Sequence, residues 1–316
     1  MMDLAPGFEI SQIPVNTAPA LDSFNITPVA DDYSSYERSG FLGWLDYNLD
    51  PIDLTGPANY SGGKFIDHTL SIGWDVAAVY GLTTAFGLSN WEWGDSGFQV
   101  KSEGWFGDDT KYAGVDKLGH AYTAYLLSDY FAQRIAHSSS DPSGANVSGA
   151  LLSMGVMTYI EIFDGFSGGH GFSPEDFVAD ASGALFSYVR SAVPGLADKI
   201  DYRMEYIPSG EVGFSPATDY AGQKYVLALK LAGFDEFKES PLRFFELQAG
   251  YYARGYTDEG REEDEDQKRE TFVAVGLNLN EILRETPLDG TIPGKALRNT
   301  LHYVQVPYTY VPTGGY

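Results

Sequence analysis

The sequence predicts an α+β protein in which a helical bundle carrying a buried polar cluster precedes an antiparallel β-sheet or partial β-barrel. Between residues 61 and 197, apolar residues recur at three- and four-residue spacing, the period of amphipathic helices. From about residue 200 the period changes to two, which is typical of strands with one apolar face. Residues 1–60 are rich in Pro, Asp, Asn and Ser and indicate an extended arm. We therefore expect three regions, 1–60, 61–197 and 198–316.

The composition excludes several classes of function. The 316-residue chain has 44 acidic and 20 basic residues and a formal net charge of −24. A chain this acidic repels nucleic-acid phosphates, so we expect no nucleic-acid partner. It has no cysteine, which excludes disulfides, thiolate metal sites and a cysteine nucleophile. The first residues lack the basic and apolar stretches of a signal peptide, so we expect none in this chain.

Four stretches carry the helical pattern, and a long aromatic connector, Trp91–Gly114, lies between the first two. Connectors of this length are often functional. No run of 18 apolar residues occurs, so we expect no membrane-spanning helix. The nearest candidate, Trp74–Leu88, is short and contains Asp75, so we interpret it as a buried core helix. The four predicted helices are Ile66–Leu88, Asp116–Ser138, Val147–Phe163 and Pro174–Val193.

Three stretches of the C-terminal region alternate apolar and polar residues. They are Lys224–Phe234, Arg243–Tyr256 and Thr271–Leu283. The acidic segment Thr257–Glu270 joins the last two and is expected to be a solvated hairpin loop. We expect the apolar face of this sheet to pack on the helices. An outer-membrane barrel with a helical plug is the alternative, although about five strands are too few to close a barrel.

The second helix carries three polar residues at its start. Asp116 and His120 are four residues apart and share a helix face, and Lys117 is three residues before His120. Asp116 begins the periodic run, so it is well placed to be the N-cap, and membership of a site is the alternative. A histidine beside an aspartate gains a fixed tautomer, which suits a general base or a metal ligand. A structural histidine with satisfied hydrogen bonds explains the same pattern.

The third and fourth helices add carboxylates. Glu161 and Asp164 end an apolar helix, where the helix dipole disfavours negative charge, so a cation such as Lys117 or a metal should compensate them. Ser173-Pro174-Glu175-Asp176 is a capping box, which explains Asp176 structurally. Asp180 lies one turn further on among apolar residues and should be paired or bound to a ligand if it is buried.

The predicted site consists of Asp116, Lys117, His120, Glu161, Asp164 and Asp180. Carboxylates and a histidine that converge in a helical bundle can bind a divalent metal or carry out acid–base chemistry. In an enzyme, His120 would be the base, Glu161 and Asp164 would be acids or metal ligands, and Lys117 their electrostatic partner. The sequence contains no metalloprotease, nucleophile-elbow, phosphate-loop or EF-hand motif that would name a reaction or a cofactor.

The segments DKLGHAYTAYLL and EIFDGFSGGHGFSPEDFVADASGALF resemble the bacterial family of uncharacterised predicted periplasmic lipoproteins (YfiM-like) and, more distantly, VanZ-type proteins. The resemblance covers about residues 98–188 and implies an envelope location but no reaction. The chain departs from this family because it lacks a lipidated cysteine and adds a β-rich C-terminal region. The matching positions are Asp116, Lys117, His120, Glu161, Asp164, Gly165, Asp176, Asp180 and Gly183.

We therefore expect a periplasmic or outer-membrane protein of the bacterial envelope. Its site would act on an envelope lipid or glycan, and the outer membrane or an envelope lipid would be its partner. A non-enzymatic scaffold or assembly protein is the alternative, in which the polar residues form a buried network that fixes the bundle. The sequence identifies neither a protein partner nor a substrate, and it does not decide whether the protein is an enzyme.

Overall fold

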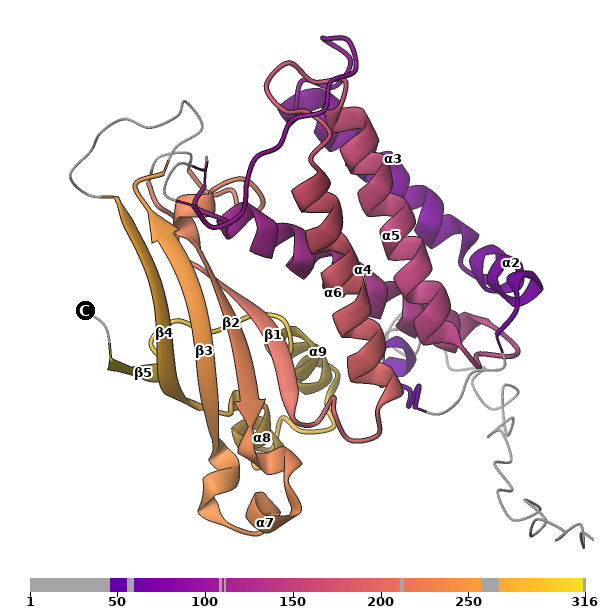
Figure 1. Ribbon diagram of the computed structural model, residues 1–316. Helices are drawn as coiled ribbons and strands as arrows, with labels where there is room; N and C mark the ends of the chain where they lie inside the picture. Colours follow the sequence, from indigo (N-terminus) through magenta and orange to yellow (C-terminus); the bar gives the residue numbers. More distant parts are fainter. Residues whose placement is uncertain are drawn as a thin grey trace, which may run out of the picture. The chain divides into compact units, whose positions relative to one another are not determined.

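The computed structural model describes residues 46–55, 60–107, 110, 112–210, 213–256 and 267–314, all within one compact unit, Leu45–Tyr316. In this unit a group of long helices lies beside a five-stranded antiparallel sheet, which confirms the predicted α+β class (Figure 1). Most of the predicted N-terminal arm, residues 1–45 and 56–59, lies outside the described residues. Most of the acidic hairpin loop, residues 257–266, lies outside them as well.

The long helices are α2 (Gly62–Ser71), α3 (Gly73–Asn90), α4 (Val115–Ser138), α5 (Ala145–Asp164) and α6 (Pro174–Ala192). The last three agree with the predicted helices to within a few residues. The first predicted helix is wrong in its continuity, because the backbone at Ile72 leaves the helical region (φ −122°, ψ 28°) and separates α2 from α3. Helical periodicity continues through such a break, so the sequence pattern does not reveal it.

The stretch Trp74–Leu88 is not the buried core helix that we expected. Trp74 is 91% exposed and Leu82 is 72% exposed, and α3 packs on the core only through its other side. Among the described residues, α5 is the helix long and apolar enough to cross a membrane by length and composition alone. Half of the apolar stretch of α5 is buried inside the fold, and a single helix of this kind is weak evidence for a membrane span.

Helix α4 is central, because it packs against α5 and α6 and also touches three strands of the sheet. Against α5 it contributes Phe131 and Ile135 to an apolar cluster that includes Trp93. Towards the sheet it contributes Tyr125, which packs with rings from the strands. Gly149 of α5 permits a close approach, because a Cβ there would lie 2.5 Å from the carbonyl oxygen of Ser128.

The sheet has the order β1-β2-β3-β4-β5, with each neighbouring pair antiparallel. Two predicted strand ends are wrong. Leu231 begins a 3-10 turn, and Leu279 begins the short helix α8 (Leu279–Arg284), because the Asn278 side chain accepts a hydrogen bond from the Glu281 amide and caps a helix there. The strands are β1 (Ile200–Tyr206), β2 (Gln223–Lys230), β3 (Phe245–Arg254), β4 (Lys268–Leu277) and β5 (Tyr310–Gly314).

The apolar face of the sheet, which we expected to be buried against the helices, is less completely buried than the polar face. Tyr202, Leu227, Ala249 and Val273 lie in register across β1 to β4 and belong to the apolar face. Only part of this face packs on the helices, and Val273 remains 58% exposed. The opposite, polar face is the more completely buried one. The prediction that the apolar face packs on the helices is therefore correct for only part of the sheet.

The polar face is buried by the chain that leads into β5. After helix α9 (Ile292–Leu301), residues 303–305 bond to Met204 of β1, and Thr309 then bonds to Leu277 of β4. Between these points the segment crosses the polar face, where Gln305 contacts Arg203 and Gln248. Ion pairs fill the space, with Arg203 bound to Asp201 and to Glu246, each at 2.7 Å. The fold thus buries charged groups by pairing them.

Candidate functional site

Three helices bring the predicted site residues together. The first turns of α4 carry Lys117 and His120, the last turn of α5 carries Glu161, and the first turns of α6 carry Asp176 and Asp180. Helices α4 and α6 approach very closely here, since a Cβ on Gly183 would lie 1.9 Å from the carbonyl oxygen of Ala121. Only glycine permits this contact, so the close approach is fixed one turn from the polar side chains.

Lys117 lies at the centre of the first group of charges. Its ammonium nitrogen is 2.7 Å from Glu103 Oε2, 2.7 Å from Asp116 Oδ2 and 2.8 Å from Asp176 Oδ1, and its side chain is only 2% exposed. The prediction that Asp116 is the N-cap of α4 is wrong. Gly114 takes that position with a left-handed backbone (φ 80°), and Asp116, in the first turn, binds Lys117. Three carboxylates therefore surround one buried cation.

His120 lies at the centre of the second group. Its Nδ1 is 3.1 Å from Asp180 Oδ1, within hydrogen-bond distance, and 3.6 Å from Glu161 Oε1. Its Nε2 is 3.9 Å from Asp176 Oδ1. Asp180 is fully buried, as expected for a paired or liganded aspartate, and its Oδ2 accepts no hydrogen bond from any residue that the structure describes. Asp176 thus lies between the two groups, beside both Lys117 and His120.

The start of α6 connects the capping motif to this second group. Ser173 is the N-cap, as predicted, and its hydroxyl accepts a hydrogen bond from the Asp176 amide. The reciprocal half of the capping box is not formed by Asp176. The amide of Ser173 instead donates to Glu161 Oε2 at 3.0 Å, so the carboxylate comes from α5 and leaves the Asp176 side chain to face Lys117.

Asp164 lies beside the group but is held separately. The indole N–H of Trp93 donates to Asp164 Oδ1 at 2.5 Å, so a neutral donor binds this carboxylate at the C-terminus of α5 in place of the cation that we expected. For Glu161 the compensation comes from His120 and the Ser173 amide. Lys117, which we considered as the compensating cation, has its close ion pairs with Glu103, Asp116 and Asp176 instead.

Burial and mutual charge move the protonation equilibria of the site. Burial raises the pKa of Glu161 to about 8 and that of Asp164 to about 6, despite the attraction of His120. Burial by itself would lower the pKa of His120, but the surrounding carboxylates, Asp176 foremost, raise it well above its ordinary value. The arrangement therefore favours an imidazolium beside a carboxyl group that titrates near neutral pH.

The sequence pattern did not predict two residues that contact the site. Glu103 and Trp93 both come from the long connector between α3 and α4, which has no periodic pattern from which a side chain's direction could be read. The length and aromatic content of this connector marked it as functional, and this was the only signal available. The roles of the predicted site residues in chemistry stay predictions, although their proximity is clear.

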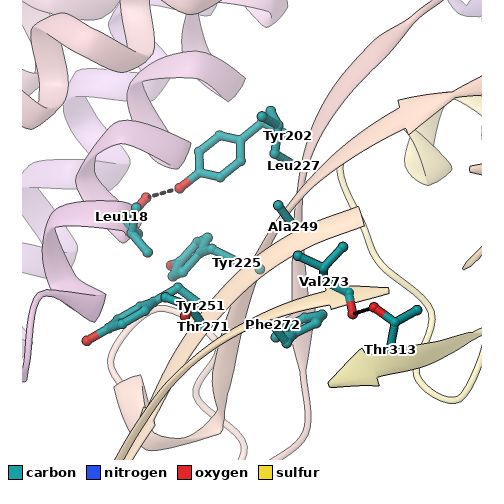
Figure 2. Close-up of a pocket in the computed structure, with 11 residues that line it drawn as sticks. Leu118, Tyr202, Tyr225, Leu227, Ala249, Tyr251, Thr271, Phe272, Val273 and Thr313 are labelled. Carbon is teal, nitrogen blue, oxygen red and sulfur yellow. Dashed lines mark hydrogen bonds between the residues drawn. The ribbon is translucent and has the colours of Figure 1, made fainter. Parts of the chain in front are cut away.

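A separate pocket lies between α4 and the apolar face of the sheet (Figure 2). Its volume is about 580 Å³. Figure 2 shows the rings of Tyr202, Tyr225 and Tyr251 near α4, with Ala249 and Val273 further along the sheet. Leu118 of α4 also lines the pocket, whereas Lys117 and His120 contact α5, α6 and the connector. Helix α4 therefore separates the pocket from the polar groups.

The polar atoms that line this pocket are largely occupied within the protein. Tyr202 donates its hydroxyl to the Leu118 carbonyl at 2.9 Å, and Tyr225 donates to Gln223 Oε1 at 2.8 Å. Tyr251 donates to the Ala113 carbonyl, and Thr313 donates to the Val273 carbonyl at 3.1 Å. Among the described residues, no side chain that lines the pocket is charged. The pocket thus presents ring faces and aliphatic carbon rather than hydrogen-bonding groups.

A helical bundle with a buried histidine–carboxylate centre, joined to a sheet with a partly open apolar face, defines the architecture. Residues 102–192 match the model of a family described as predicted periplasmic lipoprotein (DUF2279). The match is under a third of the chain and includes both polar groups, while Trp93 and the sheet lie outside it. No curated protein and no solved structure matches the chain.

This match agrees with the resemblance to predicted periplasmic lipoproteins and supports an envelope protein. It assigns no activity to the family. The narrower resemblance to YfiM-like and VanZ-type proteins stays a prediction, as does the choice between the periplasm and the outer membrane.

Proposed function

We propose that this protein is a bacterial envelope protein that binds an envelope lipid and holds one acyl chain in the pocket between α4 and the sheet. The observation that carries the proposal is the pocket lining, in which Tyr202, Tyr225 and Tyr251 offer ring faces while their hydroxyls are engaged elsewhere. A hydrocarbon chain gains by burial against such a surface, at about 0.8 kcal/mol for each buried CH₂.

The size and surroundings of the pocket support an acyl chain. A volume of about 580 Å³ lies within the range of about 300–1,000 Å³ that is usual for small-molecule sites. The apolar surface continues beyond the pocket along the same sheet face, where Leu247 and Val275 pair across β3 and β4 and are both exposed. Contiguous exposed apolar surface is typical of membrane or partner contacts. The family description, predicted periplasmic lipoprotein, supports an envelope setting.

The same lining favours a lipid over a glycan. Sugar hydroxyls that leave water need hydrogen-bond partners, and an unpaired buried hydroxyl costs about 1–3 kcal/mol. The tyrosine hydroxyls and that of Thr313 already donate to protein acceptors. A glycan would have to displace these bonds, whereas an acyl chain leaves them intact.

The polar groups on the other side of α4 favour a structural role that is compatible with lipid binding. Lys117 ties α4 to α6 through Asp176 and to the connector through Glu103. These bonds fix the helix that forms one wall of the pocket. Hydrolysis or group transfer by His120 would require a substrate to approach from the side of α4 that faces away from the pocket, so binding is the function that the geometry supports best.

Filling the pocket should abolish lipid binding. Ala249→Phe places a ring in the pocket from an exposed position, so the core is not disturbed. We expect the purified full-length protein to bind a fluorescent palmitate analogue saturably, and the variant to bind it at least tenfold more weakly. Fluorescence titration measures both affinities.

The matched control is Leu82→Trp, which adds a ring at an exposed apolar position of α3 outside the pocket. It should bind like the wild type. Equal affinity of the wild type and Ala249→Phe, or the absence of saturable binding in the wild type, would refute the proposal.

A further inference from the structure

The polar centre around Lys117 and His120 contains more acidic than basic side chains. Glu103, Asp116 and Asp176 surround Lys117, and Glu161 and Asp180 flank His120, so five close carboxylates face two basic side chains. Buried charge without a partner is costly, and proteins relieve it by pairing or by binding a metal. Lys117 occupies the centre of the first group, so a further cation would bind on the His120 side.

Asp180 supplies a second and independent observation. The residue is fully buried, its Oδ1 bonds to His120 Nδ1 at 3.1 Å, and its Oδ2 accepts no hydrogen bond from the described residues. A buried carboxylate in this state calls for a specific explanation, and a cation held by the histidine to which Asp180 is bonded is one of the few available. The carboxylate points at the same histidine that the other acids surround.

The contact between Asp180 and His120 also determines which ring nitrogen is free to bind. With Nδ1–H donating to Asp180, Nε2 is the nitrogen whose imidazolium proton an incoming cation would displace, and it faces Asp176 at 3.9 Å. A histidine that binds a metal through one ring nitrogen usually donates the N–H of its other ring nitrogen to a carboxylate, which fixes the orientation of the ring. Asp180 is then a positioning residue and Nε2 is the donor, and Glu161 Oε1, which lies 3.6 Å from Nδ1, would turn towards the ion.

The donor atoms lie close enough to share one ion. One atom each from His120, Glu161 and Asp176 falls within 4.8 Å of the other two. Bonds of about 2.1 Å to zinc span donors up to about 4.2 Å apart, so small side-chain movements would complete the contact. One imidazole and two carboxylates suit Zn²⁺ or Mn²⁺ better than Ca²⁺, which takes six to eight oxygens.

We infer that His120, Glu161 and Asp176 bind one divalent cation of the zinc or manganese type, with Asp180 holding the histidine ring in place. The second set of close carboxylates, Glu103, Asp116 and Asp176, is not such a site, because Lys117 occupies its centre. Asp176 is shared by the two groups, because its Oδ1 lies 2.8 Å from Lys117 Nζ and 3.9 Å from His120 Nε2. This site is separate from the lipid pocket and does not depend on the proposed function.

The test is calorimetric titration of the full-length, chelator-treated protein with ZnCl₂, MnCl₂ and CaCl₂ in separate runs. We expect one equivalent of Zn²⁺ or Mn²⁺ to bind and to raise the unfolding temperature, and Ca²⁺ to bind far more weakly. His120→Ala and Glu161→Gln should each lower the affinity by more than about 100-fold, and Asp180→Asn by about 10–100-fold.

His68→Asn is the matched control, because His68 is a buried histidine of α2 that bonds to Ser148 and the Asp141 carbonyl instead of carboxylates. It should bind metal like the wild type. Circular dichroism checks the fold of each variant, and the nearly isosteric Glu161→Gln and Asp180→Asn give the result if His120→Ala does not fold.

The inference is overturned if the wild type binds none of these ions saturably, or if folded His120→Ala and Glu161→Gln keep its affinity. Palmitate binding measured on the same variants separates this outcome from the proposed function. Loss of metal binding with palmitate binding intact is the expected pattern for His120→Ala, because α4 separates the two sites.

Discussion

Asp201 is the residue on which the buried charges of the sheet converge. Its carboxylate is fully buried and lies 2.7 Å from Arg203, 2.8 Å from Arg190 and 2.8 Å from Lys230. Burial by itself would raise its pKa, but the surrounding cations, Lys230 foremost, hold the pKa well below its ordinary value of 3.8. One aspartate thereby joins β1, β2 and α6.

Asp201→Asn should be strongly destabilising. The change leaves Arg190, Arg203 and Lys230 buried with one counter-charge fewer, and breaking a buried ion pair from one side costs about 3–5 kcal/mol. Because the folded-state pKa is depressed, the carboxylate contributes stability above about pH 4, and this contribution is lost as the pH falls towards the folded-state pKa. The difference in unfolding free energy between variant and wild type should therefore shrink below about pH 4.

Urea unfolding over a pH series measures this difference. Asp235→Asn is the control, because Asp235 is exposed and pairs only locally with Lys238, so its unfolding midpoint should stay that of the wild type. An Asp201→Asn variant that unfolds at the wild-type urea concentration at pH 7 would show that the network contributes no stability.

At the residue scale, the spacing of residues in the sequence was enough to predict most members of the polar centre around Lys117 and His120. Lys117 and His120 on one helix, and Asp176 and Asp180 on another, are placed by helical period, and their faces meet because glycine at 183 permits it. Glu103 could not be found in this way, because a connector without period gives no direction to its side chains. Sequence spacing also could not decide between an N-cap and an ion pair for Asp116.

At the scale of elements, the contact between α4 and α6 depends on one position. Gly183→Ala would place a Cβ 1.9 Å from the Ala121 carbonyl oxygen, and the backbone cannot yield without separating the helices. We expect a loss of about 1–3 kcal/mol or more in the free energy of unfolding, even though alanine favours the helix by about 1 kcal/mol.

Gly81→Ala in α3 is the matched control, because nothing lies within 4 Å of the Cβ it would add. It should leave the thermal unfolding temperature unchanged or raise it by a few degrees. If Gly183→Ala raised the temperature as much as Gly81→Ala does, the close packing of α4 on α6 would be wrong.

The elements themselves were largely predictable, and the errors share one cause. Periodicity identified α4, α5, α6 and the strands β2 to β4, because burial on one side imposes a period on the sequence. It failed at Ile72, where a break preserves the apolar spacing, and at Asn278, where a capping side chain starts a helix inside an alternating stretch. A change of backbone conformation sets the first boundary and a side-chain hydrogen bond sets the second, and hydrophobic spacing records neither.

At the scale of the whole molecule, the sequence predicts the two faces of the sheet but not which of them is covered. Alternation assigns Leu247 and Gln248 to opposite faces, and both assignments are correct. The covering of Gln248 depends on residues 303–309, about 60 positions later in the chain, which cross the polar face. As a result the apolar face remains partly open, and this open face is the basis of the proposed lipid site.

The most direct test of the lipid proposal is to map where a lipid lies on the full-length protein. A photoreactive palmitate analogue is bound, cross-linked and located by peptide mass spectrometry. We predict labels on the peptides that contain Leu118, Ala249 and Val273, and their loss when unlabelled palmitate competes. Labels confined to the exposed side of α3 around Trp74 and Leu82, or labels that palmitate does not displace, would contradict the account.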